Sequence, residues 1–195
     1  NGYTISKDSM PFKLTHGTLN LIGTGTIKET ADDQYSPVLI KGSTNAADTN
    51  YSVLNVGKDV TLKGWAGVFI DQNAKGAPYA YGVKVTIDGT LVSPGDVSHT
   101  TAGHAIYING NIKHTENCPT ITINQTASLS SNGDICYVAG YAKWTINCGR
   151  FSGVSGIELK AGEITINDGK FEATAASTTH VANGNGTSTS GYVLA

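Results

Sequence analysis

Two pairs of acidic residues are the best candidates for catalysis in this 195-residue chain. Hydrolysis of a glycosidic bond needs two carboxylates roughly 5–9.5 Å apart. Asp88 and Asp168 hold equivalent places in a repeated phrase, but intervening copies of the phrase separate them. Asp32 and Asp33 are adjacent, but they stand in a polar loop where solvation explains both. Neither pair predicts an acid–base site.

The other reactive residue types do not assemble into a catalytic pattern. Arg150 is the sole arginine, and its counterpart in the next repeat is Lys170, which indicates a column facing solvent. No Gly-x-Ser-x-Gly elbow is present. The histidines show no HxH or HExxH spacing, and we expect them to lie in exposed loops, although the second and third are close enough to meet. They are His16, His99, His104, His114 and His180. The sequence therefore favours a protein that is not an enzyme.

Metal and cofactor sites are not indicated either. The loop Asn45–Asn50 offers several oxygens, but it lacks the acidic density of a dedicated calcium site. The three cysteines, Cys118, Cys136 and Cys148, match no CxxC or zinc spacing. They allow at most one disulfide, and buried or neutral thiols are the favoured interpretation. We expect no bound metal and no cofactor.

The composition of the chain disfavours some classes of binding partner. Charged residues make up 14% of the chain and its net charge is −2. Nucleic acid is disfavoured, because phosphates need a dense Lys/Arg face. No apolar run approaches the ~18 residues of a membrane span. The 24 glycines, with abundant Ser, Thr and Asn, are typical of a chain rich in turns and strands.

One short phrase recurs along the chain. It reads Ile-Thr-Ile-Asn-Asp-Gly-Lys-Phe at 164–171 and Trp-Thr-Ile-Asn-Cys-Gly-Arg-Phe at 144–151, and shorter versions begin at 19, 54, 85 and 121. A second phrase, Gly-Ile-Glu-Leu at 156–159, has counterparts at 37–40, 67–70, 105–108 and 134–137. Each phrase predicts a short strand with one apolar face, which it can bury only by stacking on copies of itself. A β-sandwich also has short strands, but it does not require the same phrase in consecutive segments.

We therefore predict an all-β fold, a right-handed parallel β-helix of about six coils with loop insertions, forming a single domain over 1–195. Two columns should point inward and one outward. The first inward column is Leu19, Leu54, Val85, Ile121, Trp144 and Ile164; the second is Leu21, Val56, Ile87, Ile123, Ile146 and Ile166. The outward column between them is Asn20, Asn55, Thr86, Thr122, Thr145 and Thr165. Asp88, Asn124, Asn147 and Asn167 should form a structural column at the turn.

The outward residues of the second phrase form the candidate binding site. Read down the rod they are Leu39, Phe69, Tyr107, Cys136, Glu158 and Val193. The first three form an apolar and aromatic stripe, and such patches are enriched at interaction sites. Insertions at 42–51, 71–81 and 109–119 follow the same strands, and they should bring Tyr51, Tyr79 and Tyr81 to the edge of the stripe. Alternatively these loops fold over the stripe and cover it.

The two ends of the chain carry parts of the repeat. Ser190–Ala195 matches the segment that begins at Ser155, and Gly2–Ile5 looks like the same half-coil. Because an uncapped solenoid exposes edge strands and apolar core, we expect a segment of a longer protein.

The phrases "AGEITINDGKFEAT" and "SGYVLA" resemble the degenerate right-handed β-helix repeats of large surface proteins of Gram-positive gut bacteria, which share the pectate-lyase-like architecture. The resemblance covers most of residues 14–195. It implies a secreted or wall-attached, extracellular protein that binds a host protein, such as an immunoglobulin, or a glycan. Because one solenoid hosts many functions, a polysaccharide-active lyase or hydrolase and a passive stalk remain the alternatives.

Overall fold

The computed structural model describes residues 2–31, 34–72, 79–95, 102–110 and 116–174. Within them the chain forms nineteen short strands and no helix, in three sheets that we name A, B and C. Sheet A contains β1 (Tyr3–Lys7), β4 (Gly25–Glu29), β7 (Val60–Lys63), β10 (Thr90–Ser93), β13 (Ser128–Ser131), β16 (Arg150–Gly153) and β19 (Lys170–Ala173). Sheet B contains β2 (Phe12–Leu14), β5 (Val38–Lys41), β8 (Ala66–Asp71), β11 (His104–Ile108), β14 (Asp134–Val138) and β17 (Ser155–Leu159). Sheet C contains β3 (Gly17–Leu21), β6 (Ser52–Val56), β9 (Val83–Ile87), β12 (Thr120–Ile123), β15 (Lys143–Ile146) and β18 (Glu163–Ile166).

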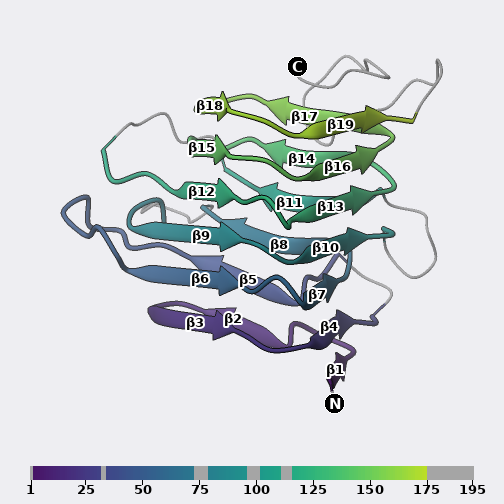
Figure 1. Cartoon of the computed structure of the whole chain (residues 1–195). Helices are drawn as coiled ribbons and strands as arrows, with labels where there is room; N and C mark the ends of the chain where they lie inside the picture. Colours follow the sequence, from purple (N-terminus) through teal and green to yellow (C-terminus); the bar gives the residue numbers. More distant parts are fainter. Residues whose placement is uncertain (1, 32–33, 73–78, 96–101, 111–115, 175–195) are drawn as a thin grey trace.

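The chain visits the sheets in the repeating order A, B, C, so each strand pairs with the strand three places along the chain. Every ladder between named strands is parallel. The coil is right-handed: strands of sheet C run rightward in front while those of sheet B run back behind them as the chain climbs (Figure 1). The predicted parallel β-helix is confirmed, and antiparallel sandwich pairing is excluded for the described strands.

The register of sheet C confirms the predicted inside and outside columns. Trp144 pairs with Ile121 below it and Ile164 above it, and Ile146 pairs with Ile123 and Ile166 in the same way. Trp144 and Ile146 are buried, whereas the outward Thr145 is exposed. Alternation with period 2 separates these faces, because successive side chains of a strand point to opposite sides. The apolar residues of all three sheets form one continuous core along the rod.

Asparagine ladders follow the turn after sheet C, as predicted. The Asn167 side-chain amide donates to Asn147 Oδ1 at 3.0 Å, and the Asn147 amide donates to Asn124 Oδ1 at 3.1 Å. A separate pair lies on the strands of sheet C itself, in the outward column, where the Asn55 amide donates to Asn20 Oδ1 at 2.8 Å. Both sets satisfy polar side chains through hydrogen bonds between coils, which supports a structural role for these residues.

One predicted assignment at the start of the chain is wrong. Gly2–Ile5 was expected to repeat the Ser155 half-coil, which belongs to sheet B. Instead Tyr3 pairs with Gly25, and β1 is the edge strand of sheet A. The alternation of Tyr3 and Ile5 fits a strand of either sheet, so the pattern alone did not fix the partner. Val193 and Ser190–Ala195 lie outside the described residues.

The three cysteines are free thiols in different surroundings. Cys136 is completely buried, and burial raises the pKa of its thiol. Burial also raises the pKa of Cys118, against the opposing effect of Lys143. Cys148 is half-buried in the turn between β15 and β16, and its Sγ lies 3.8 Å from Asp168 Oδ2.

These surroundings predict a difference in thiol reactivity. In the native protein iodoacetamide should modify Cys148 first and leave Cys136 unmodified, because only an accessible thiolate attacks the reagent. Peptide mass spectrometry after timed labelling measures the order. Modification of Cys136 as fast as Cys148, without denaturant, would contradict the buried register of β14.

Candidate binding surfaces

The predicted stripe forms a column on the outer side of sheet B. Leu39 pairs with Phe69, and Phe69 pairs with Tyr107. The column continues with Tyr137 and ends at Glu158. We call these five residues the aromatic column. Its first three members and Glu158 are those the sequence predicted.

Cys136 was assigned to this column wrongly. Cys136 pairs with Ile106 and Ile157 in the core, and Tyr137 takes the outward place. The chain turns a corner where β14 begins, and there two consecutive residues, Ile135 and Cys136, both lie in the core. The alternation of inward and outward side chains is therefore interrupted at this point. The hydrophobicity of a cysteine suits either face of a sheet, so the sequence pattern did not reveal that the outward position is one residue later.

The aromatic column combines half-buried and fully buried side chains. Phe69 and Tyr107 are half-buried, whereas Leu39 is 7% and Tyr137 4% exposed. The Tyr107 ring stacks on Tyr137 at 5.2 Å between centroids and meets Phe69 edge-on at 5.0 Å. Partial burial raises the pKa of the Tyr107 phenol, and the neighbouring Tyr137 raises it further. A partner could therefore reach two rings that their neighbours hold in place.

Two further residues support the column, and the sequence did not identify them. Trp65, directly before β8, meets Tyr107 edge-on at 4.9 Å and donates its indole N–H to the Ala102 carbonyl at 2.9 Å. His104 was expected in an exposed loop, but it begins β11, is 2% exposed and lies 5.4 Å from the Tyr107 ring. Its Nδ1 is 3.9 Å from Asp134 Oδ2. Extending the repeated phrase upstream would have placed His104 level with Ala66, which opens β8.

A polar rim borders the aromatic column. Lys41 Nζ lies 3.0 Å from Asp71 Oδ2, and the Asn109 amide donates to Asp71 Oδ1 at 2.9 Å. Lys41 and Asp71 follow Leu39 and Phe69 by two positions on their strands and so share the outer face of sheet B, and Asn109 directly follows β11. Apolar surface rimmed by polar groups is the usual composition of an interaction site.

The structure brings one of the three predicted loop tyrosines to this rim. Lys41 Nζ lies 4.6 Å from the centre of the Tyr79 ring, a cation–π contact. The Tyr51 ring instead packs against His16 at 4.7 Å. Tyr81 forms a backbone bridge with Ser43, within the 42–51 insertion that the sequence predicted.

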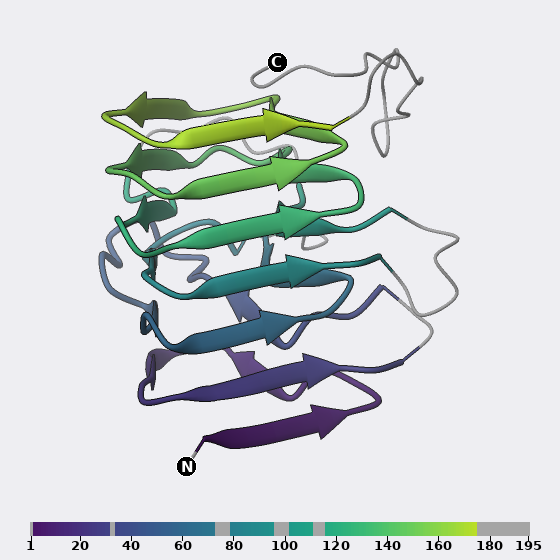
Figure 2. The same ribbon diagram turned by 45° about the vertical axis from the view of Figure 1, so that its right-hand side comes forward.

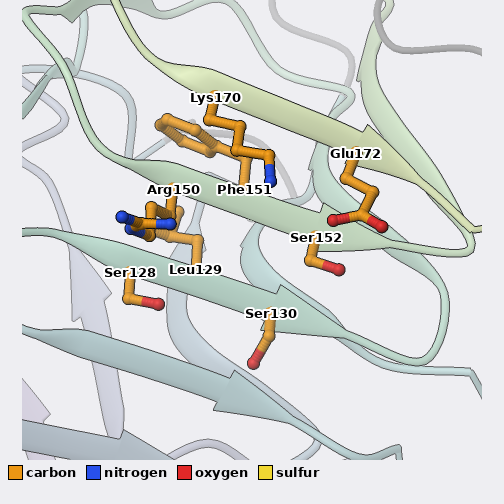
Figure 3. Close-up of a pocket in the computed structure, with 8 residues that line it drawn as sticks. All are labelled: Ser128, Leu129, Ser130, Arg150, Phe151, Ser152, Lys170 and Glu172. Carbon is orange, nitrogen blue, oxygen red and sulfur yellow. The ribbon is translucent and has the colours of Figure 1, made fainter.

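A second surface is a groove of about 190 Å³ on the outside of sheet A. Figure 3 shows its lining on β13, β16 and β19. Ser128, Arg150 and Lys170 line one side, and Ser130, Ser152 and Glu172 line the other (Figure 3). The ladder confirms the predicted pairing of Arg150 with Lys170, and both residues are exposed. The groove therefore presents two adjacent cations on one side, hydroxyl groups on both sides and one carboxylate, that of Glu172.

Comparison with known proteins finds no relative of this chain: it matches no family model, no curated protein and no solved structure. In the described ranges no three His, Cys, Asp or Glu side chains gather where a metal ion could be held. The same ranges contain no helix long and apolar enough to cross a bilayer.

Proposed function

We propose that this β-helix is a non-catalytic binding module that docks a host protein, such as an immunoglobulin, or a glycan on the aromatic column. The proposal includes an extracellular setting, on a secreted or wall-attached protein. One observation carries it: Phe69 and Tyr107 offer partly accessible rings, rimmed by the charged and amide groups of Lys41, Asp71 and Asn109. Rigid aromatic rings with polar neighbours are the side chains that dominate binding energy at interfaces.

The carboxylates around the column favour binding over catalysis. Asp71 is ion-paired with Lys41, and Glu158 lies 3.2 Å from Lys160. Asp134 is completely buried beside His104. None of these three groups forms a solvent-facing carboxylate pair of the kind that glycoside cleavage requires. A passive stalk, the other alternative, has no need of aromatic rings on its surface.

Alanine substitution tests the proposal. We expect Phe69→Ala and Tyr107→Ala each to weaken binding by about 1–3 kcal/mol, or roughly 5- to 150-fold in Kd. The measurement is biolayer interferometry against a defined panel of mucin, immunoglobulin and plant glycans. Thr122→Ala, on the outer face of sheet C, is the control, and it should leave both Kd and the melting temperature unchanged.

Two results would contradict this function. If the alanine variants lose melting temperature but bind as tightly as the wild type, the rings belong to a satellite core and the site lies elsewhere. If the wild-type protein releases oligosaccharides from a panel glycan, the module is an enzyme. Tyr107→Phe, which keeps the ring contacts, separates loss of the surface from loss of folding.

A further inference from the structure

The outer face of sheet A carries two side-chain columns, and the groove lies between their members on β13, β16 and β19. The seven strands of the sheet lie one above another on the side of the rod turned to the viewer in Figure 2. The parallel register gives one column as Thr4, Thr26, Thr61, Thr90, Ser128, Arg150 and Lys170. The other is Ser6, Lys28, Lys63, Val92, Ser130, Ser152 and Glu172. None of these side chains is buried.

Charge on this face is strongly one-sided. The two columns contain four cations and one carboxylate, in a chain whose total charge is −2. The cations form two pairs on neighbouring strands, Lys28 with Lys63 and Arg150 with Lys170. Neighbouring strands lie only about 4.8 Å apart, and like charges placed opposite each other destabilise a sheet. A face that keeps two such pairs has a positive potential available to a ligand.

The cations of this face also differ from most of the other described lysines, with Lys13 and Lys84 as the exceptions that likewise form no ion pair. Lys41, Lys143 and Lys160 each have a carboxylate within ion-pair distance. Among the described residues, no ion pair is formed by Lys28, Lys63, Arg150 or Lys170. Their charge is therefore not neutralised by a described side chain of the protein.

Hydroxyl groups predominate between the two cationic pairs. Strands β10 and β13 place Thr90, Ser128 and Ser130 there, beside Val92, and hydroxyl groups both donate and accept hydrogen bonds. The pairs are four strand spacings apart, or about 19 Å along the rod. A ligand that meets both pairs must be extended, must carry anions at intervals and must offer polar groups between them.

We infer that sheet A binds an acidic polysaccharide lying along the rod, across its strands. Carboxylate or sulfate groups contact the cationic pairs, and sugar hydroxyls contact the Ser and Thr side chains. Nucleic acid fits less well, because the two columns offer no aromatic ring for base stacking and too few cations for its phosphate density. This surface is distinct from the aromatic column on sheet B and adds a second ligand to the proposed function.

Charge-neutralising double variants test the inference. The probes are dextran sulfate, hyaluronan, which carries carboxylates alone, and neutral dextran, with duplex DNA as a competing polyanion. We expect Arg150→Gln with Lys170→Gln, and Lys28→Gln with Lys63→Gln, each to weaken binding of an acidic probe about 10-fold and to reduce its salt dependence. Lys13→Gln with Lys84→Gln is the matched control, since both are exposed lysines outside sheet A and neither forms an ion pair among the described residues.

The control and the probes make the outcomes decisive. The site is supported if an acidic probe binds, the sheet A variants weaken that binding and the control variant does not. Comparing dextran sulfate with hyaluronan then shows whether sulfate or carboxylate groups are recognised. Equal losses in all three double variants would mean diffuse charge attraction and would overturn it. Absence of binding to both acidic polysaccharides, or tighter binding to DNA, would also overturn it. Phe69→Ala should leave this binding intact, so failure here is distinguishable from failure of the sheet B site.

Discussion

Replacing Ile146 with aspartate should unfold the domain. Ile146 is completely buried in the inner column of sheet C, between Ile123 and Ile166. An isolated carboxylate there would lose its hydration without gaining a partner, and this costs several kcal/mol. Small domains are stable by only about 5–15 kcal/mol, so this loss is a large part of the free energy of unfolding. We expect Ile146→Asp to be largely unfolded and to show little or no cooperative unfolding transition. Thermal and denaturant unfolding followed by circular dichroism measure the loss.

The adjacent residue gives the control for this prediction. Thr145 precedes Ile146 on the same strand, but its side chain is exposed on the outer face. Thr145→Ser keeps the hydroxyl and should change the free energy of unfolding by less than about 0.5 kcal/mol. Similar losses at both positions would mean that the inside and outside faces of sheet C have been assigned wrongly.

Position along the rod should also decide the cost of a substitution. Ile123 and Ile166 belong to the same inner column, but Ile123 is completely buried and Ile166, in the last described coil, is 43% exposed. We expect Ile123→Ala to destabilise the protein by about 2–5 kcal/mol, since a buried isoleucine leaves a cavity. Ile166→Ala should cost less than about 1 kcal/mol, because little area is lost there.

Denaturant titration of both variants gives this comparison directly, since the two substitutions delete the same atoms. Comparable losses at the two positions would argue against a stack of coils in which each repeat contacts mainly its neighbours. A larger loss at Ile166 would place it inside a core and contradict its position near the end of the described rod.

The sequence predicted sheet C well because its signal is redundant. In the phrase shared by β15 and β18, Thr145 and Thr165 stand between inward residues, and an Asn follows each strand. A one-residue shift would bury threonine and expose isoleucine in several coils at once, so a single register satisfies the whole set.

Sheet B was harder to predict, for a physical reason. At the start of β14 the chain turns a corner with Ile135 and Cys136 both in the core, so strict alternation fails there and Tyr137 was missed. His104 was missed because a histidine near a polar insertion resembles a loop residue, and its burial depends on Trp65 packing across the corner. The sequence predicted the pairing of Arg150 with Lys170, but the pairing of Lys28 with Lys63 became visible only from the strand register.

The accessibility of the aromatic column tests the proposed binding function most directly. Hydroxyl-radical footprinting, read by peptide mass spectrometry, compares oxidation of individual side chains in the free protein and in complex with a bound panel member. We expect Phe69 and Tyr107 to be oxidised readily in the free protein and protected in the complex, while buried Tyr137 and Trp65 react slowly in both. If Phe69 and Tyr107 react as slowly as Tyr137 in the free protein, no partner can reach them and the proposed site is wrong.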